Sequence, residues 1–275
     1  MSSSPVNAVP PSALLGTLYL VPAPLDFGCE RLAPITDVLP LGTLQVAARL
    51  THWIGENAKT TRAVLKRVGE VLPLAAPIQQ HTITELPREV HKKGDHTGGK
   101  QAFDAKPLLH AALQGHDIGL ISEAGMPAVA DPGSSVVRAA HALGLRVVPL
   151  TGPCSLLLAL AASGLNGQNF AFVGYLPIDS AARNLRIKEL EVLALKTGQT
   201  QLFIEVPHRN AALLQALVSI LQPSTRLSLS SGITLSGAST RSSMVAQWVK
   251  TAKDAGHSGL AASDLPTVFA IGVAA

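Results

Sequence analysis

Residues 121–133 read ISEAGMPAVADPG, between an apolar run that ends at Ile121 and a helical pattern that begins at Ser134. The segment combines glycines, prolines and two acidic residues, and it contains no aromatic residue. A loop this open costs backbone entropy on folding, so we expect something to lie against it. It also follows the carboxyl end of an expected strand, where open α/β sheets place their ligands.

The end of this loop resembles the start of a helix. Asp131-Pro132 and Ser134 suit a helix N-terminus, whose amide groups favour negative charge, and Gly125 and Gly133 allow close backbone approach. The usual dinucleotide and P-loop signatures are missing. From the residues alone, a small-molecule loop and an ordinary long turn both remain open.

Short apolar runs alternate with helical patterns along the chain, as in α/β domains built on parallel sheets. Around the opening loop we expect strands over 117–122 and 145–150, joined by a helix over 134–143. Upstream, strands are expected over 17–21 and 52–56, a helix over 58–69 and a candidate short strand over 72–76. Residues 81–106, which include HKKGDHTGGK, have no periodicity and predict a long loop.

The second half continues with a helix that opens after TGP at 151–153. Strands are then expected over 170–175, 200–206, 226–231 and 267–273, with helices over 179–196, 207–221 and 243–253. The segment LNGQN at 165–169 predicts a boundary. We therefore expect a flexible tail over 1–14, an N-terminal α/β domain over 15–167 and a C-terminal α/β domain over 168–275.

Composition limits the protein class. Of 275 residues, 47% are hydrophobic and 15% charged, which indicates a globular chain. Aromatic residues make up only 4%, which argues against base-stacking platforms. No apolar run reaches the roughly 18 residues of a membrane span, and the first residues lack a signal-peptide pattern. Two cysteines cannot form a disulfide framework, so we expect a cytoplasmic protein.

Polar clusters offer weaker candidates. The histidines do not follow a zinc-ligand spacing, so no metal site is predicted. The basic loop with Lys92, Lys93, Lys100 and Lys106 is either a solvated segment or a phosphate contact. In EVPHRN, His208 or Arg209 either serves a pocket, or Arg209 pairs with Glu205.

With these residues in view, the chain resembles the tetrapyrrole methylase superfamily and, within it, the ribosomal RNA small subunit methyltransferase I group. The similarity runs through LYLVPAPL, the stretch from Leu120 to Leu165, FVGYLP and FIEVPHR. The central stretch carries the S-D-A-G-x-P, D-P-G and P-G-P pattern of that family in order, with Glu123 in place of the usual aspartate.

The resemblance implies a methyltransferase that uses S-adenosyl-L-methionine, with two α/β domains and the cofactor in the cleft between them. Ribosomal RNA, methylated on a ribose 2′-hydroxyl, is the implied substrate, and a homodimer is the implied assembly. The implied cofactor-binding residues are Pro22, Ser122, Ala124, Gly125, Met126, Pro127, Ala128, Val129, Thr151, Gly152, Pro153, Tyr175 and Leu176.

Departures from the family pattern concern the substrate side. GENAKTT replaces A-E-D-T-R-H-T, which keeps Glu56 as the predicted catalytic residue but puts Asn57, which cannot act as a base, in place of an aspartate. Asp26 is an alternative proton acceptor. SSGITLS replaces the charged R-E-L-T-K motif. Two alternatives therefore stay open: methylation of a small molecule or tetrapyrrole-like ring, and an inactive cofactor-binding protein.

Overall fold

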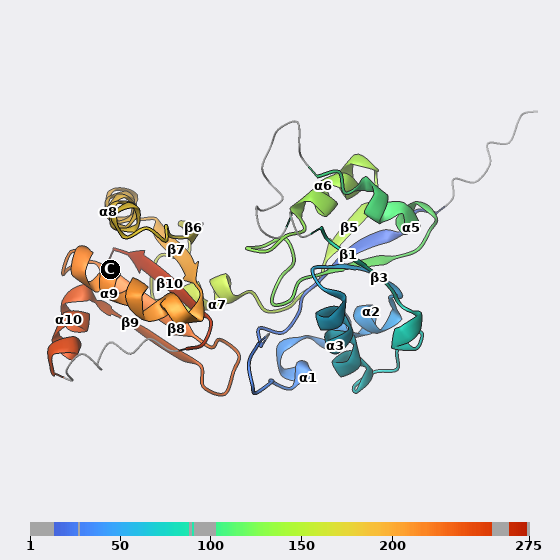
Figure 1. The fold of residues 1–275 in the computed structure, drawn as a ribbon, viewed down its shortest axis with the longest axis horizontal. Helices are drawn as coiled ribbons and strands as arrows, with labels where there is room; N and C mark the ends of the chain where they lie inside the picture. Colours follow the sequence, from blue (N-terminus) through green and yellow to red (C-terminus); the bar gives the residue numbers. More distant parts are fainter. Residues whose placement is uncertain (1–13, 27, 88–89, 91–102, 255–263, 274–275) are drawn as a thin grey trace, which may run out of the picture. The chain divides into compact units, whose positions relative to one another are not determined.

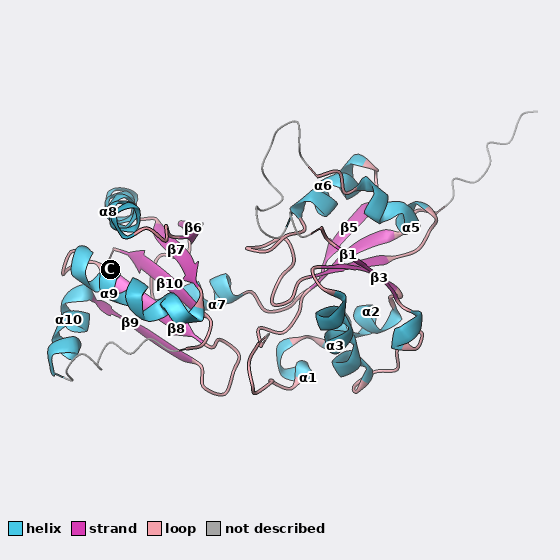
Figure 2. Cartoon of the chain, in the orientation of Figure 1, coloured by secondary structure: helices cyan, strands magenta, loops and turns pink. Residues whose placement is uncertain are grey.

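The computed structural model describes residues 14–26, 28–87, 90, 103–254 and 264–273, drawn by sequence in Figure 1 and by secondary structure in Figure 2. The chain divides into two units, each with its own five-stranded sheet. The first unit comprises residues 1–23 and 39–152, and the second comprises residues 24–38 and 153–275. Among the described residues, no helix is long and apolar enough to cross a membrane.

The sheet of the first unit has the strand order β3-β2-β4-β1-β5, and every neighbouring pair is parallel. This confirms the parallel α/β architecture expected for this part of the chain. Its elements are β1 (Thr17–Val21), α2 (Leu41–Arg49), β2 (His52–Gly55), α3 (Ala58–Gly69), β3 (Thr82–Glu85), α5 (His110–Leu113), β4 (Ile118–Ile121), α6 (Ser134–Ala142) and β5 (Arg146–Pro149), with 3-10 turns at Ile78–Gln80 and Lys106–Leu109.

Helices cover both faces of this sheet, with α2 and α3 on one side and α5 and α6 on the other (Figure 1). Every residue of the central strand β4 is therefore buried, as continuous apolar parallel strands require. Leu18, Ile118 and Leu120 pack with Val136 of α6 in one hydrophobic cluster. This packing holds the carboxyl ends of β1, β2 and β4 in one fixed edge.

Two expectations for this unit were wrong, and one helix was missed. The sequence predicted a strand over 72–76, but the structure has turns there, and Leu72 N donates to Val68 O. The segment 81–106 is not one long loop, because β3 pairs in parallel with β2. The helix α2 was not expected at all. The lysines at 92, 93 and 100 lie outside the described residues.

The second unit has a mixed sheet in the order β6-β7-β10-β8-β9, where only β6 and β7 are parallel. Its elements are α1 (Ile35–Val38), α7 (Ser155–Ser163), β6 (Phe170–Tyr175), α8 (Ser180–Thr197), β7 (Thr200–Glu205), a 3-10 turn (Pro207–Arg209), α9 (Asn210–Ile220), β8 (Arg226–Ser231), β9 (Ser239–Met244), α10 (Val245–Asp254) and β10 (Thr267–Gly272). Strand β9 was not expected from the sequence. The helix expected over 243–253 begins at Val245, and the two residues before it belong to β9.

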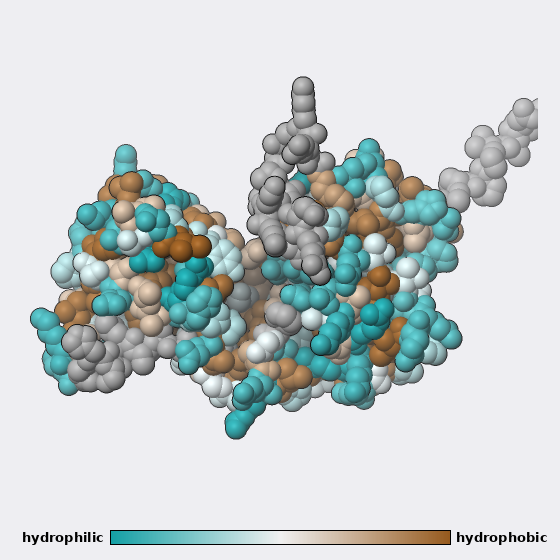
Figure 3. All heavy atoms as spheres, in the orientation of Figure 1, coloured by the Kyte–Doolittle hydropathy of each residue, from teal (hydrophilic) through white to brown (hydrophobic). Residues whose placement is uncertain are grey.

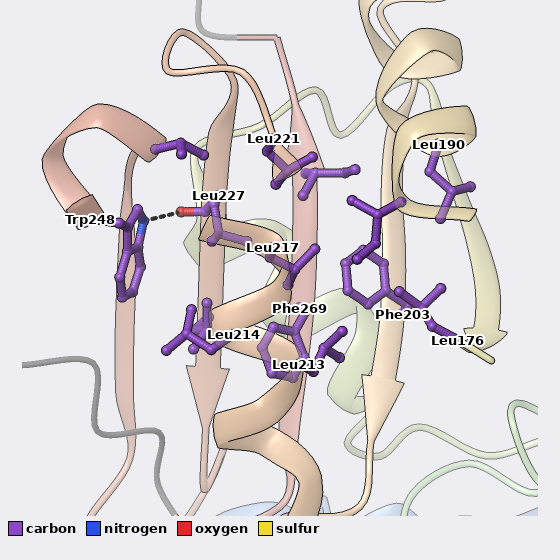
Figure 4. Packing of buried hydrophobic residues seen from close by; sticks show 14 residues of the cluster. Leu176, Leu190, Phe203, Leu213, Leu214, Leu217, Leu221, Leu227, Trp248 and Phe269 are labelled. Carbon is purple, nitrogen blue, oxygen red and sulfur yellow. Dashed lines mark hydrogen bonds between the residues drawn. The ribbon is translucent and has the colours of Figure 1, made fainter. Parts of the chain in front are cut away.

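The central strand β10 of this sheet is buried along its whole length because helices cover both of its faces. Phe203 and Phe269 pack with side chains of α8, α9 and α10 on one face, as Figure 4 shows, and Trp248 Nε1 donates to Leu227 O at 3.1 Å. On the other face, Leu156 and Leu160 of α7 join a second cluster. The division point therefore precedes α7, whereas the expected boundary at 167–168 follows it.

Candidate functional site

Four strand ends meet at the carboxyl edge of the first sheet. The segments that follow them are Pro22-Ala23 after β1, Glu56-Asn57 after β2, Ser122–Gly133 after β4 and Leu150–Gly152 after β5. β2 and β4 are neighbours, yet α3 follows β2 on one face of the sheet and α6 follows β4 on the other. Such a switch point is where open α/β sheets bind ligands.

Two backbone hydrogen bonds join the segments after β1 and β4. Ala23 N donates to Gly125 O at 2.9 Å, and Gly125 N donates to Ala23 O at 3.0 Å. Gly125 has φ of +76°, a conformation that L side chains rarely adopt. Glycine adopts this conformation at residue 125 without the strain that a side chain would add.

The segment after β5 packs closely on the segment after β1. A Cβ atom at Gly152 would lie 2.4 Å from Pro22 Cβ and 3.2 Å from Leu39 Cδ2. Thr151 is also held, because Thr43 Oγ1 of α2 donates to its carbonyl oxygen at 2.7 Å. Pro22, Thr151 and Gly152, which the sequence predicted together, thus lie together.

The loop after β4 is unusual in its backbone. Ala128 and Ala130 both have φ of +65°, and Gly133 has φ of +129°. Each left-handed non-glycine residue costs about 1–3 kcal/mol and persists only where the surroundings impose it. Ala128 N donates to Pro132 O at 3.3 Å across the loop. The loop is an ordered and strained segment, which favours the small-molecule interpretation over an ordinary turn.

Ser122 lies at the base of this loop with 5% of its surface exposed. Its Oγ is buried and has no hydrogen-bond partner among the described residues. Buried hydroxyl groups are nearly always hydrogen-bonded, so an orphaned one at a strand end indicates a missing partner. The Ser122 hydroxyl could donate a hydrogen bond to a ligand, and Gly152 leaves backbone without a side chain at the same edge. Both features are compatible with a small polar ligand at this edge of the sheet.

Three carboxyl groups gather beside the same loop. Glu123 N donates to Glu56 Oε1 at 3.2 Å, and Thr60 Oγ1 donates to Glu123 Oε1 at 3.3 Å. Burial, and then the negative charges of Glu56 and Glu123, raise the pKa of Asp131 to about 7. We call Glu56, Glu123 and Asp131 the acidic cluster. The sequence marked Asp131 only as a helix start, because nothing local shows that Glu56 lies near it.

Asn57 has a structural role next to this cluster. Its side-chain oxygen accepts from Lys59 N at 2.8 Å and Thr60 N at 3.3 Å, which caps the N-terminus of α3. An aspartate could make the same contacts, so the asparagine keeps the cap and removes one negative charge. Glu85 of β3 accepts from Ala58 N at 2.6 Å and adds a second acceptor at this helix end.

The remaining predicted residues are distributed over both units. Ala124, Met126, Pro127 and Val129 belong to the loop after β4 in the first unit, and Val129 is exposed. Pro153, Tyr175 and Leu176 belong to the second unit, where Tyr175 is exposed and Leu176 packs in the hydrophobic core.

Three weaker candidates can now be placed. Arg209 pairs with the buried Glu205, with Nη2 and Oε1 2.6 Å apart, which confirms the expected ion pair. Asp26 is buried and belongs to the second unit. Among the described residues, no group of three histidine, cysteine or acidic side chains could hold a metal ion.

Comparison with known proteins gives a consistent picture. The family model for tetrapyrrole (corrin/porphyrin) methylases matches residues 41–240. Ribosomal RNA small subunit methyltransferase I of Pseudomonas aeruginosa is 32% identical over 205 residues, which cover 74% of this chain and 61% of that protein. The enzyme of the same name from Escherichia coli O157:H7 is 31% identical over 238 residues, covering 86% of this chain and 72% of that protein.

Among solved structures, uroporphyrin-III C-methyl transferase from Thermus thermophilus, complexed with S-adenyl homocysteine, superposes with a TM-score of 0.51. The alignment covers 94% of this chain and 97% of that one at 14% identity, so it supports the fold alone. The two-unit α/β fold expected from the sequence is confirmed.

The contact between Gly152 and Pro22 generates a first prediction. Gly152→Ala places a methyl group inside the Pro22 ring, so the segment after β5 must move, and overpacking of this kind costs about 1–3 kcal/mol. Urea denaturation monitored by circular dichroism measures the loss. Gly167→Ala, where no atom lies within 4 Å of the added Cβ, is the matched control and should unfold as the wild type does. Equal stability of both variants would contradict the packing described here.

Proposed function

Since the chain belongs to the tetrapyrrole methylase family, we propose that it transfers a methyl group from S-adenosyl-L-methionine to ribosomal RNA, on a ribose 2′-hydroxyl. The relatives named for ribosomal RNA methylation support the substrate class. The chain spans only 61% of the length of the P. aeruginosa relative. Membership of the family therefore does not by itself give this chain the activity and the substrate of that enzyme, and both are proposed here.

The observation that carries the proposal is the edge formed by Pro22, Gly125 and Gly152, with the buried hydroxyl of Ser122 at its base. We assign cofactor binding to this edge and to the loop through Val129. The match to the tetrapyrrole methylase family supports this choice of ligand, and the T. thermophilus protein of the same fold was solved with S-adenyl homocysteine bound. The cofactor contacts of Pro153, Tyr175 and Leu176, which belong to the second unit, stay a prediction from the sequence.

The acidic cluster suits a cationic ligand. S-adenosyl-L-methionine, when bound, supplies an electrophilic methyl group on a positively charged sulfonium. Carboxylates near a cation are stabilised in their ionised form, and the attraction increases with each ionised carboxylate. The ionised cluster therefore favours the charged cofactor over its neutral thioether product.

Asp131 is also a candidate for the proton transfer that the reaction requires. A 2′-oxygen that forms a bond to the methyl carbon must lose its proton, and a base with a pKa near the working pH accepts it most effectively. The pKa of Asp131 is about 7 in the protein without ligand, and a sulfonium cation nearby would lower it, so that the carboxylate is ionised and able to accept the proton at neutral pH. We propose Asp131 as the base and keep Glu56 as a catalytic residue, because its charge helps to set that pKa.

A second prediction concerns pH. Asp131 is protonated in the folded protein below its pKa of about 7 and ionised above it, so the cluster gains one negative charge between pH 6 and pH 8. The affinity ratio of S-adenosylmethionine to S-adenosylhomocysteine should rise roughly fivefold over this range, since only the former carries the sulfonium charge. Isothermal titration calorimetry with both ligands measures the ratio.

Two matched variants test the role of Asp131. In Asp131→Asn the affinity ratio should be independent of pH. In Asp254→Asn, at the exposed end of α10, the ratio should rise with pH as it does in the wild type. A pH-dependent ratio that persists in Asp131→Asn would show that another group carries the effect.

A third prediction tests the substrate. Purified protein with methyl-labelled S-adenosylmethionine should label the RNA of small ribosomal subunits from cells that lack the gene, and alkaline hydrolysis should leave a resistant dinucleotide at the 2′-O-methylated position. Label only in a small-molecule extract would favour the alternative of tetrapyrrole-like substrates. Tight cofactor binding without any transfer would favour an inactive binding protein.

We further propose that the protein acts as a homodimer in the cytoplasm, where ribosomal subunits are found. Support for self-association comes from α8, which exposes Leu185 (61%), Val192 (61%) and Leu193 (41%). Hydrophobic patches near α8 and β6 are visible in Figure 3. Exposed apolar surface on a helix is typical of protein interfaces.

The fourth prediction follows from this surface. Sedimentation equilibrium should give twice the chain mass for the wild type, and Leu185→Glu together with Val192→Lys should shift the protein to the monomer. Lys188→Ala on the same helix is the control and should stay dimeric. A wild-type monomer at micromolar concentration would refute the proposed assembly.

A further inference from the structure

The second unit contains a pocket that no part of the cofactor proposal uses. Its volume is about 390 Å³, and it lies between residues 31–38 and the loop after β8. Its wall is formed by Leu32, Pro34, Val38 and Leu235, while Arg31, Asp37, Thr234 and Ser236 supply polar groups. This volume falls within the range of small-molecule sites, which combine apolar walls with a few polar groups.

Thr234 is the most unusual residue of this pocket. It has φ of +74°, which is a genuine outlier for a β-branched side chain. Its Oγ1 is buried and has no hydrogen-bond partner among the described residues. The turn around it is fixed, because Leu235 N donates to Gly232 O at 2.8 Å and Gly232 N donates to Pro266 O at 3.0 Å. A strained residue with an unsatisfied hydroxyl in a fixed turn indicates a ligand contact.

Arg31 and Asp37, the two charged residues of the pocket, could also bind a ligand. In the described part of the chain, neither the Arg31 guanidinium nor the Asp37 carboxylate forms an ion pair. A guanidinium is the preferred partner of a phosphate, and a carboxylate accepts from the amino groups of bases. One ligand that uses both groups carries an anion and a heterocycle with hydrogen-bond donors.

We propose that this pocket, defined by Arg31, Asp37 and Thr234, binds one unstacked nucleotide of the RNA substrate. Arg31 contacts its phosphate, Asp37 accepts from the amino group of its base, and Thr234 Oγ1 forms a further hydrogen bond. The proposal rests on the proposed RNA methyltransferase function and adds a binding site to it. It favours adenine, cytosine or guanine over uracil, because uracil has no amino group.

A nucleotide explains the pocket better than a free phosphate does. An anion alone would use Arg31 and would be repelled by Asp37, which lines the same pocket. The apolar side chains of Leu32, Pro34 and Leu235 would also be left without a function, whereas a base covers such surface.

The test measures binding of short, fluorescently labelled single-stranded RNA to the full chain by anisotropy over a range of salt concentrations. Arg31→Ala should weaken binding about tenfold and lower the salt slope by about 0.7, the value for one phosphate contact on a single strand. Lys188→Ala, which removes one positive charge from α8, should change the affinity less than twofold. Thr234→Val should weaken binding about fivefold, and Thr234→Ser, which keeps the hydroxyl, should bind as the wild type does.

Base identity supplies the decisive comparison. Asp37→Ala should weaken binding of oligo(C) and oligo(A) several-fold and leave oligo(U) unchanged. S-adenosylhomocysteine binding serves as the folding control and should be equal in all variants. If Arg31→Ala and Lys188→Ala weaken RNA binding equally, or if inorganic phosphate competes as well as a nucleoside monophosphate, the nucleotide site is refuted.

Methyl transfer to small ribosomal subunits, measured in parallel, separates the two proposals. If Arg31→Ala and Thr234→Val leave methyl transfer unchanged, the proposed nucleotide site is wrong, but the proposed methyltransferase function stands. No transfer and no RNA binding by the wild-type protein overturns the RNA function, and the nucleotide site with it.

Discussion

The close approach of Gly152 to Pro22 is the constraint on which the rest of the site depends. A side chain of any size at residue 152 would overlap the proline ring, so the strand ends of β1 and β5 meet without a side chain between them. The paired hydrogen bonds between Ala23 and Gly125 join the loop after β4 to the same point. Three segments far apart in the sequence are thereby fixed along one sheet edge, with backbone atoms and small side chains at its surface.

This arrangement explains why the loop after β4 is both open and ordered. Its left-handed residues at Ala128 and Ala130 cost energy that neighbouring packing must offset. The buried Ser122 hydroxyl has no hydrogen-bond partner among the described residues, and we propose that the backbone of this loop forms the ligand surface. Burial and the charges of Glu56 and Glu123 raise the pKa of Asp131, and we propose that the acidic cluster selects for a cationic ligand.

The sequence was sufficient where the local pattern carried the structure. The strands β4 and β10 are buried throughout, β1 is partly buried, and all three are rich in apolar residues, so each was expected from the sequence. It failed at β3 and β9, whose residues TITE and STRSSM are mostly polar because both are edge strands with little burial. The edge strands β5 (RVVP) and β6 (FAFVGY) keep an apolar signal and were expected, so the polar sequence of β3 and β9, and not the edge position alone, removed the signal on which strand prediction depends. The raised pKa of Asp131 and the pocket beside Thr234 could not be predicted, because each depends on residues from distant segments.

We propose above all that the edge formed by Pro22, Gly125 and Gly152 binds S-adenosyl-L-methionine. Amide hydrogen exchange of the full chain, with and without saturating S-adenosylhomocysteine, tests it most directly because it locates the ligand on the backbone. We expect slower exchange in peptides that cover residues 122–129 and 150–153, and unchanged exchange in peptides from α8. Protection confined to other segments, at a ligand concentration that calorimetry shows to be saturating, would contradict it.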